Sequence, residues 1–101
     1  MSIKKEYFKT KPTCKVTFKL PEKIAQYASK ASLVGEFNDW DLRGIPMKKL
    51  KNGEFKASLQ LEKNKEYQFK YLVNEETWEN ENEADKYVPN AFQGENSVIV
   101  V

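Results

Sequence analysis

The chain contains no histidine. Histidine is the commonest general base, the base of the usual catalytic triads and a ligand in most zinc sites, so its absence disfavours those enzyme classes. The four glycines are scattered along the sequence, which leaves no glycine-rich loop to hold a phosphate. We therefore expect a protein that is not an enzyme and that carries no metal and no cofactor.

Cysteine is almost absent as well, because Cys14 is the only one. A single cysteine cannot form a disulfide within the chain, which suits a small packing residue in a reducing compartment. No apolar run reaches the length needed to cross a bilayer, and residues 1–5 lead into polar sequence rather than the apolar core of a signal peptide. We expect a cytoplasmic protein with no membrane partner.

Arginine is represented only by Arg43, although 17 basic residues face 15 acidic ones and the net charge is +2. Proteins that read nucleic acids usually rely on arginine forks and on one concentrated basic face. The balance therefore argues against a nucleic-acid partner. A polyanion stays conceivable because lysines cluster near the start of the chain, at Lys4, Lys5, Lys9, Lys11, Lys15 and Lys19.

Alternation of apolar and polar residues predicts most of the fold. Period-two patterns over residues 14–20, 55–61 and 67–73 are typical of half-buried strands, and the chain ends in a further apolar strand. Strands recur with turn residues between them, and no segment keeps a helical period. We therefore predict an all-β fold, an immunoglobulin-like antiparallel β-sandwich. Residues 1–13 are expected to form an N-terminal arm or edge strand, and residues 14–101 a single domain.

Three connecting segments have weaker signals. Residues 21–32 contain helix-forming residues but are predicted as a loop. Residues 45–50 are predicted as one short edge strand, because a proline such as Pro46 is tolerated best at a sheet edge. Residues 79–96 are predicted as a long polar loop.

An acidic pattern lies at the start of this last loop. Acidic residues occupy every second position, at Glu79, Glu81, Glu83 and Asp85. The spacing matches the first half of a calcium loop, but Ala84 stands where such a loop needs glycine and Asn90 where it needs glutamate. The pattern predicts a solvent-exposed loop with no dedicated metal site, and an adventitious cation site is the minor alternative.

The sequence LVGEFNDW, at residues 33–40, is an apolar strand that stops at a polar turn. A large apolar ring on such a turn has two interpretations. Trp40 either packs on the edge of the sandwich, which is the more common use of an aromatic residue, or forms an exposed platform for a ligand. Asp39 and Asp41 flank it with the residue types of a glycosidase pair, but turn aspartates more often cap the backbone.

Trp78 is a second tryptophan outside the alternating core pattern. If the aromatic residues of 67–71 face the core, Lys70 points to the opposite, solvent-facing side. A sugar ring has one apolar C–H face and an edge of hydroxyls, so a site for it needs flat aromatic platforms and a few hydrogen-bonding groups. Trp40, Trp78 and Lys70 supply both.

Three segments together resemble carbohydrate-binding module family 48. They are VGEFNDW at residues 34–40, EYQFKYLV at 66–73 with Trp78 after the turn, and NSVIV at 96–100. That family includes the glycogen-binding domain of the AMP-activated kinase beta subunit and the early-set N-terminal domains of isoamylases and glycogen branching enzymes. The resemblance covers roughly residues 14–101 and implies an early-set sandwich.

The resemblance also implies a ligand and a set of contacts. In kinase-type members, two tryptophans, a lysine on the strand between them and an asparagine before the last strand contact an α-1,4-glucan. Trp40 and Trp78 match the stacking positions, and Lys70 and Asn96 match the hydrogen-bonding ones. Phe92 falls where the family has a leucine that projects into the sugar.

The chain departs from that pattern at two places. The turn before Trp78 has one residue more than in the kinase-type domains and lacks their glycine. Gly94 replaces a threonine that touches the ligand in those domains, so we expect that contact to be missing.

The expected function is a non-catalytic module that binds an α-1,4-glucan such as glycogen, starch or maltodextrin. The alternative is an immunoglobulin-like protein-docking module with a vestigial sugar face, whose partner is a glycogen-metabolising enzyme. A sheet edge at residues 45–50 or the N-terminal arm would then provide the docking surface.

Overall fold

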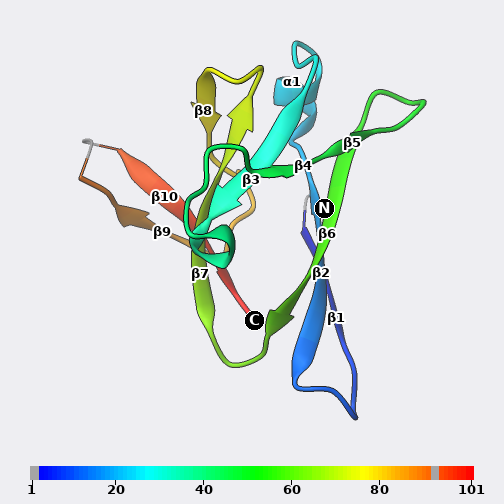
Figure 1. The fold of residues 1–101 in the computed structure, drawn as a ribbon, viewed down its shortest axis with the longest axis vertical. Helices are drawn as coiled ribbons and strands as arrows, with labels where there is room; N and C mark the ends of the chain where they lie inside the picture. Colours follow the sequence, from blue (N-terminus) through cyan, green and yellow to red (C-terminus); the bar gives the residue numbers. More distant parts are fainter. Residues whose placement is uncertain (1–2, 92–93) are drawn as a thin grey trace.

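The computed structural model describes residues 3–91 and 94–101 and contains two antiparallel β-sheets packed against each other (Figure 1). The first sheet has the order β1-β2-β6-β5, made of β1 (Ile3–Tyr7), β2 (Thr13–Lys19), β6 (Phe55–Glu62) and β5 (Lys48–Lys49). The second has the order β4-β3-β7-β10-β9, made of β4 (Ile45–Pro46), β3 (Ala31–Gly35), β7 (Glu66–Val73), β10 (Glu95–Val100) and β9 (Lys86–Pro89), and β8 (Thr77–Glu79) pairs with β7. The predicted immunoglobulin-like β-sandwich is confirmed.

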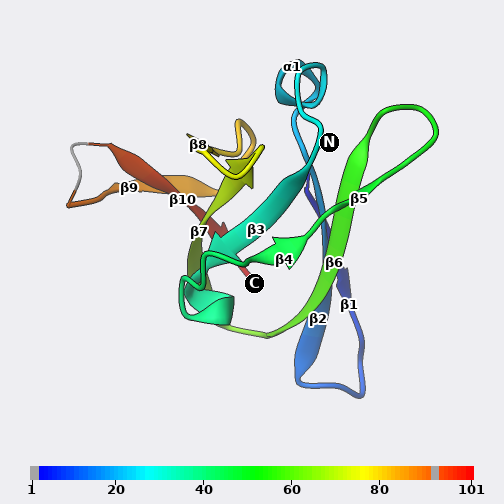
Figure 2. The same ribbon diagram turned by 45° about the horizontal axis from the view of Figure 1, so that its top comes forward.

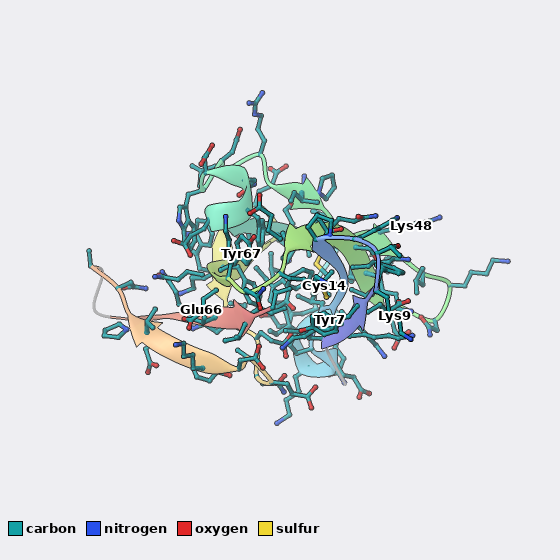
Figure 3. All side chains as sticks on the ribbon, turned by 90° about the horizontal axis from the view of Figure 1, so that it is seen from below. Tyr7, Lys9, Cys14, Lys48, Glu66 and Tyr67 are labelled. Carbon is teal, nitrogen blue, oxygen red and sulfur yellow. The ribbon has the colours of Figure 1, made fainter. Side chains whose placement is uncertain are left out.

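The core lies between the sheets and is built from inward-facing residues of both. On β2, Cys14, Val16 and Phe18 are fully buried while the residues between them are not, as the alternation predicts. Cys14 lies in the interior of the molecule (Figure 3). Phe18 packs edge-on against Phe69 of β7, with 5.2 Å between the ring centroids, which joins the two sheets.

β7 determines which side chains leave the core. Phe69 and Tyr71 point inward and are fully buried. The residues between them face the outer side of the second sheet, so Lys70 emerges there between β3 and β10. The β9–β10 hairpin projects beyond the rest of this sheet (Figures 1 and 2).

Three connecting segments differ from expectation. A short helix, α1 (Glu22–Ala25), replaces part of the predicted loop over residues 21–32. Residues 79–96 are not one loop, because β9 lies within them and pairs with β10.

None of the helices in residues 3–91 and 94–101 has the length and apolar character that crossing a bilayer requires.

The predicted single edge strand at residues 45–50 is divided between the sheets. β4 pairs with β3 in the second sheet, and β5 pairs with β6 in the first. Met47 lies between them, and it is buried while its backbone N–H donates to the carbonyl of Ala31 at 2.9 Å. The segment therefore crosses from one sheet to the other at Met47, whose side chain belongs to the core.

The prediction that Glu81 lies in a solvent-exposed loop is wrong, because its side chain is completely buried. Its carboxylate accepts a hydrogen bond from the Tyr71 hydroxyl at 2.7 Å and another from the Glu83 N–H at 2.8 Å. Its own N–H donates to the Ser97 hydroxyl at 2.9 Å. These partners compensate the cost of burying a carboxyl group. Within residues 3–91 and 94–101, no three or more Cys, Asp or Glu side chains are grouped so that they could hold a metal ion.

The Tyr71–Glu81 pair has a consequence for stability at high pH. Burial raises the pKa of Tyr71 well above its ordinary value of 10.0, and the adjacent Glu81 raises it further. Above about pH 10 the unfolded chain therefore loses this proton while the folded chain keeps it, so the contribution to stability falls as pH rises.

We predict that Tyr71→Phe lowers the free energy of unfolding by about 1–3 kcal/mol at pH 7–9, because Glu81 loses a buried donor. The gap between wild type and variant shrinks by up to about 1.4 kcal/mol per pH unit above pH 10. Urea denaturation of both proteins between pH 8 and 11 measures this gap. Lysine titration affects both proteins alike, so a gap that stays constant across this range would contradict the prediction.

Candidate functional site

A groove of about 700 Å³ opens on the outer face of the second sheet. Among the described residues, seven line it: Trp40, Leu42, Lys70, Trp78, Asn90, Gly94 and Asn96. Four of the five residues predicted for the site are among them. The fifth, Phe92, lies outside the described residues. Sequence reasoning missed Leu42 and Asn90, and the only available signal was an exposed leucine two residues after Trp40 in a polar turn.

Trp40 reaches the groove from a turn that its backbone hydrogen bonds define. The 3₁₀ helix η1 (Glu36–Asn38) follows β3 directly. The Trp40 N–H then donates to the carbonyl of Gly35 at 2.9 Å, and the Asp39 N–H donates to the carbonyl of Glu36. This pair of bonds is a Schellman ending, with Asp39 in the left-handed conformation that such an ending requires.

The backbone of Trp40 is itself left-handed, with a φ of 56°. This conformation is unfavourable for a bulky residue, so the surrounding bonds must hold it there. The indole remains 36% exposed and does not belong to the buried core. Trp40 is therefore not a fully buried core residue, and part of its side chain is open to the groove.

Asp41 stabilises the same turn rather than facing the groove. Its carboxylate accepts hydrogen bonds from the Arg43 N–H and the Arg43 guanidinium, each at 2.9 Å. The guanidinium lowers the pKa of this carboxyl below its ordinary value. Asp41 thus acts as a capping residue.

Gly35 allows this turn to lie directly against β7. A Cβ at Gly35 would stand 2.5 Å from the carbonyl oxygen of Gln68 and 2.7 Å from Cβ of Phe69, which is too close for any side chain. The adjacent Glu36 carboxylate accepts a hydrogen bond from the Gln68 N–H at 2.6 Å, which fixes the turn to the same strand.

Trp78 enters the groove from β8, directly opposite Leu72 of β7. The indole is 42% exposed. The turn before it contains two consecutive left-handed residues, Asn74 and Glu75. Asparagine tolerates this conformation better than most non-glycine residues, which suits Asn74 to this turn.

The side chain of Asn74 also anchors this hairpin to the segment before β3. Its Oδ1 accepts hydrogen bonds from the Ser29 N–H at 2.8 Å, the Ser29 hydroxyl at 3.0 Å and the Lys30 N–H at 3.2 Å. On the far side of the hairpin, the Tyr27 hydroxyl donates to Glu79. The position of Trp78 is therefore fixed from two sides.

Lys70 extends from β7 between the hairpins that carry the aromatic residues. Its backbone pairs with Val34 of β3, and its side chain is half-buried. Within residues 3–91 and 94–101 the ammonium makes no ion pair and no side-chain hydrogen bond. Its three donors are available to a ligand.

Three side-chain amides form a chain along the groove. The Gly94 N–H donates to Oδ1 of Asn90 at 3.1 Å, which turns the Asn90 amide nitrogen toward Oδ1 of Asn96, also at 3.1 Å. Asn96 in turn donates to Oε1 of Gln68 at 3.0 Å. The Gly94 N–H can only donate, so the atom of Asn90 that faces it must be the amide oxygen. The amide nitrogen of Asn90 then faces the oxygen of Asn96, and the nitrogen of Asn96 faces the oxygen of Gln68. Asn96 is therefore held in one orientation at the groove.

The charges and exposed groups limit what the groove can bind. Among the described residues, Lys70 is the only charged one that lines the groove, so no carboxylate of this part of the chain lines it. Both tryptophans line the groove, and neither indole N–H donates a hydrogen bond within the part of the chain that the structure describes. The surface therefore offers apolar ring faces, N–H donors and one cation, which suits a ligand rich in hydroxyls or a weak anion.

An immunoglobulin-like sandwich with an open groove of aromatic and amide side chains defines a β-sandwich binding module. The family model for carbohydrate-binding module 48, described as the isoamylase N-terminal domain, matches residues 13–91. The chain belongs to this family, as predicted, and carbohydrate binding follows as its general function. No curated protein gives a significant match to the chain.

We predict that Gly35→Ala lowers the free energy of unfolding by about 1–3 kcal/mol, because the new methyl group must push η1 away from β7. The matched control is Gly94→Ala, where the nearest atom to the added Cβ would be 3.6 Å away. We expect the control to stay within about 0.5 kcal/mol of wild type. Chemical denaturation of the three proteins measures both effects, and equal stability of all three would refute the close approach of Gly35 to β7.

Proposed function

We propose that the chain is a non-catalytic module that binds α-1,4-linked glucans such as glycogen, starch or maltodextrin. Trp40 and Trp78 stack on glucose rings, while Lys70 and Asn96 hydrogen-bond to hydroxyls. One observation carries the proposal: residues from the turn after β3, from β7, from β8 and from β10 all line a single groove. The α-1,4 linkage follows from the family resemblance, and so does the contact assigned to Phe92.

Exposed aromatic rings supply most of the binding free energy in this account. Covering about 80–100 Å² of apolar ring surface contributes on the order of 2 kcal/mol per tryptophan. The loss of translational freedom and the desolvation of hydroxyls offset much of this gain, so we expect dissociation constants in roughly the micromolar to millimolar range. Lys70 adds hydrogen bonds and fixes the position of the sugar edge.

The absence of catalysis is part of the proposal. Hydrolysis of a glycosidic bond needs two carboxyl groups placed on either side of it. The described lining of the groove contains none, and the nearby Asp41 is paired with Arg43. A bound glucan would therefore be held without being cleaved.

The alternative, a protein-docking module for a glycogen-metabolising enzyme, has less support. It would use an unpaired sheet edge, and in the first sheet the edges are β1 and β5. β5 contains only two residues, both of them lysines, and β1 contains Lys4 and Lys5. Short, lysine-bearing edges disfavour the addition of a partner strand.

We predict that Trp40→Ala and Trp78→Ala each weaken binding to glycogen at least about tenfold, because each removes one apolar platform. Affinity electrophoresis in gels that contain glycogen measures the retention. Tyr7→Ala is the matched control, since Tyr7 is an exposed aromatic residue on β1, in the other sheet. We expect its retention to equal that of wild type.

The same variants test whether the tryptophans have a packing role instead. Truncating a buried tryptophan costs about 3–5 kcal/mol, whereas we expect a much smaller loss here because both indoles are partly exposed. Wild-type retention by folded Trp40→Ala and Trp78→Ala proteins would overturn the site assignment.

A further inference from the structure

A second groove, of about 570 Å³, adjoins the first on the outer face of the second sheet. It lies over the start of β3, between the turn that carries Arg43 and the β7–β8 turn that carries Glu75. Leu42 and Trp78 line both grooves. The two grooves therefore share a wall, formed by these two apolar side chains. Each has the size of an ordinary small-molecule site.

The second groove contains hydrogen-bonding groups in a suitable arrangement for sugar hydroxyls. Lys30 and Glu75 form an exposed ion pair at its rim, so the pair can donate and accept hydrogen bonds without adding net charge. Ser32 is half-buried in the groove, and its hydroxyl makes no hydrogen bond within residues 3–91 and 94–101. Arg43 lies at the opposite rim, where its guanidinium is largely exposed.

We propose that a glucan chain bound in the first groove continues past the wall of Leu42 and Trp78 into the second groove, an inference that rests on the proposed function. Trp78 then contacts sugar units on both sides of the wall. Lys30, Glu75 and Ser32 hydrogen-bond to the units that lie beyond it. The module is accordingly a reader of extended linear chains, and a ligand that fills only the first groove uses half of the surface.

The composition of the second groove explains why it depends on the first. Within residues 3–91 and 94–101, Trp78 is the only aromatic residue that lines it. A sugar in the second groove alone has one platform and otherwise only exposed polar contacts, which contribute little against the cost of association. A chain already held by Trp40 and Lys70 has lost most of its translational and rotational freedom. Contacts made by its further units therefore add favourable binding free energy. Affinity should therefore rise with chain length until both grooves are filled.

The test compares chain-length dependence in wild type and in a paired variant. Isothermal titration calorimetry with maltotriose, maltoheptaose and maltodecaose gives the dissociation constants. The variant is Lys30→Ala/Glu75→Ala, which removes an ion pair whose side chains are 61% and 74% exposed. The matched control is Glu62→Ala/Lys65→Ala, which removes a similar pair, with Lys65 56% and Glu62 64% exposed, away from both grooves.

We expect wild type and control to bind the two longer sugars more tightly than maltotriose. In Lys30→Ala/Glu75→Ala, binding of the longer sugars weakens roughly three- to tenfold, which corresponds to one or two lost hydrogen bonds, while maltotriose binding is unchanged. Ser32→Ile is a second variant that removes the hydroxyl and narrows the groove floor, and it should reduce the length dependence in the same way.

Other results would overturn the inference. If wild type binds all three sugars equally, or if both second-groove variants keep the full gain with length, the second groove holds no sugar, although the proposed function stands. If wild type binds none of the three, the proposed function fails and the second groove fails with it. The two failures are thus distinguishable within one set of titrations.

Discussion

The alternation of side chains along β7 is the constraint on which the rest of the structure depends. Phe69 and Tyr71 face inward and join the two sheets, so the residues between them must face outward. Lys70 reaches the groove for this reason alone. β7 also pairs with β3, β10 and β8. Trp40 lies in the turn after β3, Asn96 in β10 and Trp78 in β8. Core packing and the lining of the groove are therefore fixed by one strand.

The two tryptophans are placed by turns, and each turn is held by an unusual local feature. The turn before Trp40 needs Gly35, since any side chain there would collide with β7. The turn before Trp78 needs Asn74, which takes a left-handed conformation and binds the segment before β3. Rigid turns reduce the entropy lost when a ligand binds, so a preorganised groove suits weak, polar sugar ligands.

The sequence predicts the features that depend on local periodicity. The strands, their inward faces and the outward position of Lys70 all follow from alternation, and the family follows from motif spacing. Features that depend on distant partners escaped prediction. Glu81 was expected in solvent, because the hydroxyls of Tyr71 and Ser97 that accompany its burial come from other strands. Leu42 belongs to a turn with no repeating pattern, so only the folded chain brings it to the groove.

Tryptophan fluorescence gives the most direct test of the central claim, because the chain has two tryptophans and both line the groove. Maltoheptaose is titrated into the protein, with cellohexaose as the control for linkage geometry. We expect a saturable change in emission with the α-linked sugar and none with the β-linked one. No change with either sugar up to about ten millimolar, a concentration above the expected range of dissociation constants, would contradict it.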